Sequence, residues 1–131
     1  MAVIQSFRDL HVYKVAREQA KKIFVLTQRF PREERYSLID QIRRSSRAVN
    51  AILAEGWARR RCQPSFVNKV NESLGEAMET QAWLDHALDC DYLTPLEHRE
   101  LDEAWQHIGA MLNSMIIRSD DFFGSASRRR T

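Results

Sequence analysis

Arginine side chains offer the most chemistry in this sequence of 131 residues. A guanidinium is always charged and its fork of N–H groups matches a phosphate, so clustered arginines are typical of surfaces that bind nucleic acid. Six arginines fall on one predicted helix over residues 36–61, five of them candidates for phosphate contact, and a pair of lysines falls on the helix before it. The candidates for phosphate contact are Arg43, Arg44, Arg47, Arg59, Arg60, Lys21 and Lys22.

The basic residues admit a second interpretation. Residues 1–61 hold 14 Lys and Arg against 6 Asp and Glu, net +8, whereas residues 62–103 hold 2 against 10, net −8. The arginines therefore contact an anionic partner, pair with the acidic third helix of a neighbouring subunit, do both, or simply form a solvated face. No recognition-helix turn, zinc finger or RNA-recognition motif accompanies them, so sequence-specific reading is not indicated.

Other chemistry has little support. His86 and Cys90 lie four residues apart and could supply two metal ligands, but an exposed helix end is the favoured interpretation. The sequence holds no E-x-x-H pair of a di-iron bundle, and no G-x-S-x-G, H-E-x-x-H or glycine-rich phosphate loop. Cys62 lies beside Arg61 without an identifiable base. We therefore expect no catalytic residue, no metal, no cofactor and no enzymatic activity.

Composition indicates a cytoplasmic protein. The two cysteines form no disulfide framework, and the start of the chain lacks the layout of a signal peptide. No apolar run approaches the ~20 residues that a membrane helix needs. We therefore expect a cytoplasmic protein with reduced thiols and no membrane partner.

Four helices must position the arginines. Over residues 36–61, apolar and small residues recur at alternating steps of four and three, which places them on one helix face. That face consists of Leu38, Ile42, Ser45, Val49, Ile52 and Gly56, widened by Leu53 and Trp57. The late arginines suit the negative end of the helix dipole and should close this helix.

The other three helices follow from similar signals. One should run from about residue 10 to 29, capped by Asp9 and ended by Pro31, with Val12, Ala16 and Ile23 facing inward. Another should run from about residue 65 to 89, where mid-helix Gly75 predicts a close backbone contact. The last, about residues 95–118, should begin with a capping box.

These elements predict an all-α fold. Short connections make neighbouring helices antiparallel, so the expected architecture is an up-down-up-down four-helix bundle. Residues 1–119 should form a single domain, and residues 120–131 a flexible C-terminal tail.

Several blocks of residues together resemble a known family. They are FRDLHVYKVA (7–16), FPREERYSLIDQIRRSS (30–46), the AEG of residues 54–56 followed by Arg59, and ESLGEAMET (72–80). The chain is similar in these blocks to the four helix bundle protein family, also called the 23S rRNA intervening-sequence protein family. It departs at Ile52, where the family often has Asn, at Glu72, where it often has a small residue, and at Asn50, where it commonly has Pro.

The resemblance implies a homopentamer of four-helix bundles with a central channel. The family is similar to the accessory protein of diversity-generating retroelements, a basic pentamer that binds nucleic acid. By that analogy Arg43, Arg44, Arg47 and Arg59 are expected to contact RNA or DNA. Our hypothesis is a non-enzymatic oligomer that binds nucleic acid, structured RNA rather than DNA. The alternative is a structural or interaction scaffold whose charged faces mediate self-assembly.

Overall fold

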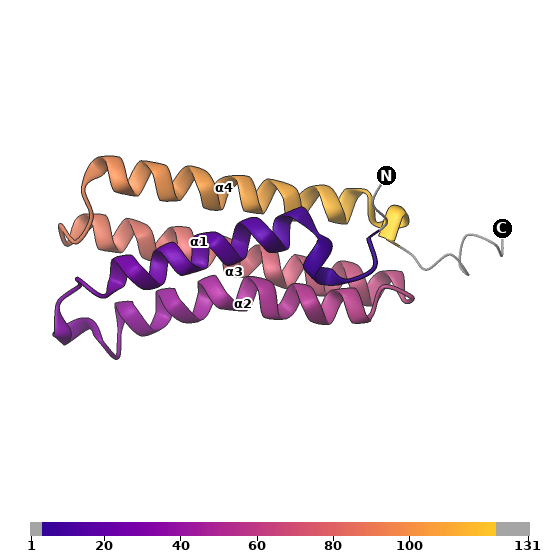
Figure 1. Cartoon of the computed structure of the whole chain (residues 1–131), viewed down its shortest axis with the longest axis horizontal. Coiled ribbons are helices and arrows are strands. Elements are labelled where there is room, and N and C mark those ends of the chain that lie inside the picture. The colour runs from indigo at the N-terminus through magenta and orange to yellow at the C-terminus, as the bar shows by residue number, and fades with distance from the viewer. Residues whose placement is uncertain (1–3, 123–131) are drawn as a thin grey trace.

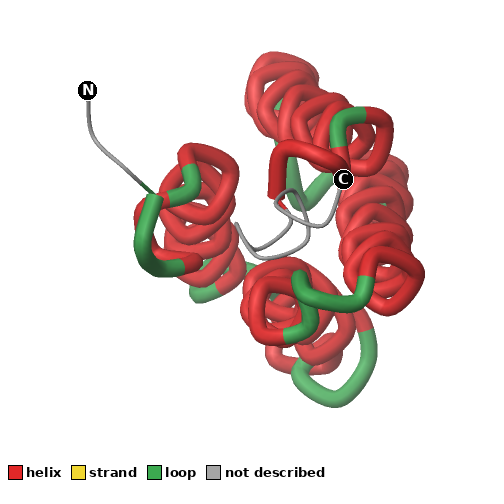
Figure 2. Tube along the Cα trace, turned by 90° about the vertical axis from the view of Figure 1, so that its right-hand side faces the viewer, coloured by secondary structure: helices red, strands yellow, loops and turns green. Residues whose placement is uncertain are grey.

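Four long helices dominate the computed structural model, which describes residues 4–122 (Figure 1). They are α1 (His11–Thr27), α2 (Leu38–Ala58), α3 (Gln63–Asp89) and α4 (Pro95–Ile117). Short 3-10 helices lie at Phe7–Asp9, Arg32–Glu34 and Ser119–Phe122. Consecutive helices run antiparallel, and the end-on view shows them around a common centre (Figure 2). The predicted all-α four-helix bundle is therefore confirmed.

The predicted inward faces form the core. Val12, Ala16 and Ile23 of α1 are buried, and α2 contributes its predicted positions except Ile52 and Trp57, which are half-buried. From α4, Trp105, Ile108, Leu112 and Met115 complete one continuous cluster. The spacing of apolar residues therefore determines which side of each helix faces its neighbours.

Polar side chains interrupt this core between α2 and α3. Ser45 and Thr80 share a hydrogen bond of 2.8 Å, and Ser73 Oγ donates to the carbonyl of Val49 at 2.7 Å. All three side chains are fully buried. Because a buried hydroxyl without a partner is costly, these bonds help to fix the register of α3 against α2. Ser45 is thus a packing residue.

Helix ends show one accurate prediction and two wrong ones. Thr94 and Glu97 form the expected capping box at the start of α4. Asp9 does not cap α1, because its carboxylate pairs with Ser6 in a capping box one turn earlier, at Phe7–Asp9. The arginines at residues 59–61 do not belong to α2, which ends at Ala58 with Arg59 as its C-cap.

The close helix contact predicted at Gly75 occurs instead at Gly56. A Cβ built on Gly75 meets no atom within 4 Å, so the predicted close contact at this residue is wrong. A Cβ on Gly56 would lie 3.2 Å from Cβ of Lys69. The close approach of α2 to α3 therefore occurs at Gly56, near the connection between these helices.

Residues after α4 continue the folded unit. Phe122 stacks on Phe66 of α3 with ring centroids 5.6 Å apart, and Gln63 Nε2 donates to Ser119 Oγ at 2.8 Å. The 3-10 helix at Ser119–Phe122 thus includes the first three residues of the segment that was predicted to be a tail, 120–131. Residues 123–131 of that tail lie outside the described residues.

The two connections at one end of the bundle are tied together. The Arg29 guanidinium pairs with the Glu97 carboxylate, and Tyr92 Oη donates to Glu34 Oε2 at 2.9 Å. The bond from Arg29 and those from the Thr94 cap lower the pKa of Glu97 to about 2. Tyr92, held by Glu34, has its pKa raised to about 12.

Stability should therefore depend on pH through Glu97. A depressed pKa means that ionised Glu97 stabilises the folded state fully above pH ~4.5, and that this contribution is lost as the pH falls toward ~2. The partly exposed pair limits the effect to about 1 kcal/mol or less. We expect Glu97→Gln to show a shallower loss of unfolding free energy than wild type between these pH values in denaturant titrations. Equal slopes for the two proteins would contradict this assignment.

Candidate nucleic-acid interface

The predicted basic residues do not form one surface. Arg43 and Arg47 contact the side of α1, whereas Arg44 reaches toward α3. Arg59 and Arg60 follow the last residue of α2, at the opposite end of the bundle from the connection between α1 and α2 (Figure 1). Each group has different neighbours, and the neighbours decide which charges are available.

Two of the arginines, Arg43 and Arg47, lie over the aromatic ring of Phe24 in α1. The guanidinium carbon of Arg43 lies 4.7 Å from the centroid of the Phe24 ring, and that of Arg47 lies 5.6 Å from it. Arg43 Nε also donates to Thr27 Oγ1 at 2.8 Å, which fixes its position. Within residues 4–122, no ion pair joins either guanidinium to a carboxylate. Among the described residues, neither positive charge therefore has a carboxylate at ion-pair distance.

Arg44 behaves in the opposite way. Its guanidinium pairs with Glu76 at 3.0 Å and with Glu79, both on α3. The hydrogen bond to Glu76 is the main reason that the pKa of Arg44 is raised above its ordinary value. The acidic third helix thus neutralises this arginine within the same chain. Arg44 is a helix-pairing residue in this structure and the weakest of the predicted phosphate contacts.

Further basic residues join Arg43 and Arg47. Arg35, in the connection between α1 and α2, lines two neighbouring pockets together with Ile39 and Arg43, and Arg32 lines one of the two. One pocket has a volume of about 320 Å³ and the other of about 450 Å³. We call Arg32, Arg35, Arg43 and Arg47 the arginine face. Arg32 and Arg35 were not among the predicted contacts, although the charged run after Pro31 marks them in the sequence.

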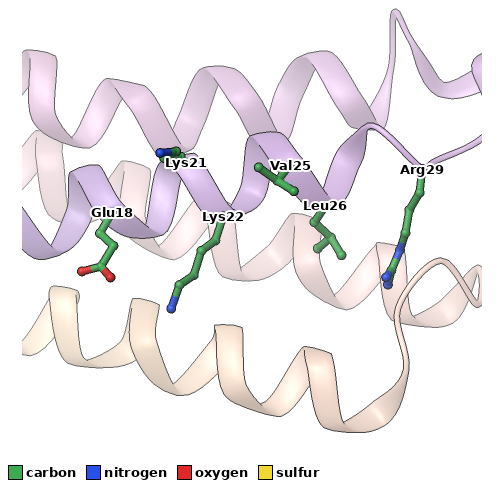
Figure 3. A pocket seen from close by; sticks show the side chains of 6 residues that line it. All are labelled: Glu18, Lys21, Lys22, Val25, Leu26 and Arg29. Atoms are coloured by element: carbon green, nitrogen blue, oxygen red, sulfur yellow. The ribbon is translucent and has the colours of Figure 1, made fainter.

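The predicted lysines lie on a different part of α1. Lys21 and Lys22 line a groove of about 580 Å³ together with Glu18, Val25, Leu26 and Arg29. Figure 3 shows Lys22 and Arg29 extending toward the ribbon of α4, whereas the side chain of Lys21 does not extend toward α4. These lysines therefore extend the basic surface around α1, away from the arginine face.

Arg59 and Arg60 form a separate basic site. Arg60 lies over the Trp57 ring at 4.2 Å and donates to the Trp57 carbonyl at 3.0 Å. These contacts close the C-terminal end of α2, and Arg59 beside them is exposed. A ligand that spans the length of α2 would be needed to contact both this pair and the arginine face.

One group of side chains has the composition of a metal site. Asp85, His98 and Asp102 place three possible ligand atoms within 4.8 Å of one another. His98 Nε2 lies 2.8 Å from Asp85 Oδ1, and Gln81 Nε2 donates to Asp102 Oδ1 at 3.2 Å. These contacts between α3 and α4 account for the grouping without an ion. His86, which the sequence offered with Cys90 as a possible but disfavoured ligand, packs on Trp83 with ring centroids 5.7 Å apart.

The geometry defines a class of protein: an all-α four-helix bundle with a basic face where α1 meets α2. Within residues 4–122, no helix has the length and apolar character needed to span a membrane. The model of the 23S rRNA-intervening sequence protein family matches residues 8–114. The chain therefore belongs to this family, as the sequence blocks predicted.

A solved structure supports the same assignment. It is a protein with unknown function from the S23 ribosomal protein family of Bacteroides thetaiotaomicron, with a TM-score of 0.70 and 25% sequence identity. The alignment covers 80% of this chain and 97% of that one. A comparison with curated proteins found no match. The relatives thus support family and fold.

Proposed function

We propose that this protein is a non-enzymatic, cytoplasmic RNA-binding bundle that contacts the phosphates of structured RNA through the arginine face. The observation that carries this proposal is that Arg43 and Arg47, beside Arg32 and Arg35, form no ion pair with a carboxylate among the described residues. Four guanidinium groups around two pockets provide an anionic ligand with forked N–H donors and release its counterions on binding. The family's link to intervening sequences of 23S rRNA favours RNA over DNA as the partner.

We also propose that the chain assembles with itself, as a homopentamer by family resemblance. Large apolar side chains on three helices support assembly, since Val25 is 56% exposed, Met78 58% and Ile117 74%. Exposed apolar groups on several sides are typical of subunit contacts. Self-assembly alone is the second candidate function, in which the protein is a scaffold and binds no nucleic acid.

Salt dependence distinguishes the two functions. A labelled structured RNA is titrated with the protein at several salt concentrations, while fluorescence anisotropy reports binding. With about four phosphate contacts, affinity should fall about a hundredfold between 50 and 200 mM salt. Sedimentation at the same salt concentrations reports the assembly.

The scaffold function predicts the opposite pair of results. Salt would then change the sedimentation of the protein, and the labelled RNA would stay free even at low salt. Absence of RNA binding by the folded protein would overturn the proposed RNA-binding function.

A further inference from the structure

Tyr36 is the most unusual side chain near the arginine face. It is 85% exposed, although a tyrosine ring normally packs against other groups. It lies in the short segment between the 3-10 helix Arg32–Glu34 and α2, where its neighbours in sequence are Arg35 and Ser37. Its ring contributes little to the core of this chain, so its contribution to folding does not explain its position.

The surroundings of Tyr36 are positively charged. It lines the 450 Å³ pocket together with Arg35, Arg43, Arg44 and Arg47, and Asp40 is the one carboxylate among the lining residues. Because Glu76 and Glu79 neutralise Arg44, three guanidinium groups remain against one carboxylate. The guanidinium carbon of Arg35 also lies 5.9 Å from the centroid of the Tyr36 ring. A ligand of this pocket must therefore be anionic and have a flat surface for the ring.

An unpaired nucleotide has both properties. Its base can stack on an exposed aromatic ring, and its phosphates can contact arginines around the ring. A base inside a duplex is already stacked on both faces and cannot lie on Tyr36. The pocket volume also falls within the ~300–1,000 Å³ of small-ligand sites.

We propose that Tyr36 stacks on an unpaired base of the bound RNA while Arg35 and Arg47 hold the phosphates beside it. This inference rests on the proposed RNA-binding function and specifies its ligand: RNA with a single-stranded loop rather than a continuous duplex. Tyr36 thereby selects the form of RNA that the arginine face alone would bind without distinction.

Two labelled RNAs test the proposal: a hairpin with a uridine loop, and a blunt duplex with the same number of phosphates. Fluorescence anisotropy gives the affinity of each for wild type, Tyr36→Ala and Tyr36→Phe. We expect Tyr36→Ala to weaken hairpin binding about tenfold or more and to leave duplex binding unchanged. Tyr36→Phe should retain hairpin binding, because it keeps the aromatic face. Leu96→Ala, an exposed position on α4, is the matched control and should bind both RNAs as wild type does.

The outcomes distinguish a failure of the proposed stacking role of Tyr36 from a failure of the proposed RNA-binding function. If wild type binds neither RNA, both proposals fail. If wild type binds the hairpin with a steep salt dependence and Tyr36→Ala binds it equally well, only the stacking role fails. If Tyr36→Ala weakens hairpin and duplex alike, or lowers the sedimentation coefficient, Tyr36 is a subunit contact and the stacking role is overturned. Circular dichroism should show all variants folded, since both mutated side chains are largely exposed.

Discussion

Charge reversal of the arginine face should lower RNA affinity by about a hundredfold or more at moderate salt. The variant is Arg35→Glu with Arg47→Glu, because both side chains are exposed and neither forms an ion pair within residues 4–122. Each change removes a charge-assisted contact to phosphate and adds a repelling charge. Arg43 is left intact, since its bond to Thr27 supports the packing of α1 on α2. Anisotropy titrations against structured RNA measure the effect.

The opposite end of the bundle provides a matched control. Arg59→Glu with Arg61→Glu makes the same change in net charge at two exposed positions after α2. We expect this control to lose much less affinity, and its salt dependence to stay close to that of wild type. Equal losses in the two variants would indicate that overall charge governs binding. A larger loss in the control would move the interface to the end that holds Arg59 and Arg60.

Trp105→Ala should remove much of the protein's stability. Among residues 4–122, Trp105 is the largest fully buried side chain, and it lies midway along α4. Truncating a buried tryptophan removes its apolar contacts and leaves a cavity, which costs about 3–5 kcal/mol. A domain of this size has about 5–15 kcal/mol in total. Urea unfolding, monitored by circular dichroism at several protein concentrations, measures the loss and whether it depends on concentration.

Phenylalanine at the same position is the informative comparison. The indole Nε1 of Trp105 is buried without a hydrogen-bond partner among the described residues. Trp105→Phe retains much of the ring and removes this unpaired donor, so it should cost about 1–2 kcal/mol, well below the cost of alanine. Similar losses for the two variants would show that the indole makes a specific contribution that the ring contacts do not explain.

The sequence contained enough local information to predict the helices. Thr94, Pro95 and Glu97 mark the first turn of α4 because capping depends on neighbours within one turn. The period of apolar residues gave the buried faces of α1 and α2 for a similar reason. Asp9 was misassigned because two overlapping turns compete for one carboxylate. Each of these signals acts over a few residues and is readable without a fold.

The candidate interface was only partly predictable, because its charges depend on contacts distant in sequence. Arg43, Arg44 and Arg47 look equivalent along the helix, yet only Arg44 reaches Glu76, 32 residues away. The rotation of α2 against α3 decides this, and no local pattern encodes that rotation. Arg32 and Arg35 were missed because the connection between α1 and α2 brings them beside Arg43 only in the folded chain. Similarly, Gly75 gave a wrong contact because a glycine alone does not show which helix faces it.

The two cysteines lie at opposite ends of α3, where Cys62 precedes its first residue and Cys90 follows its last. Both thiols are free and exposed. A helix of 27 residues separates them by about 40 Å at ~1.5 Å per residue, far beyond the ~7 Å between Cα atoms that a disulfide tolerates. Oxidation therefore cannot close a disulfide inside one molecule. Each molecule instead has two thiols, one at each end of α3, that can form disulfides with other molecules. Oxidation should therefore give a series of covalent multimers, which a reducing agent returns to monomers.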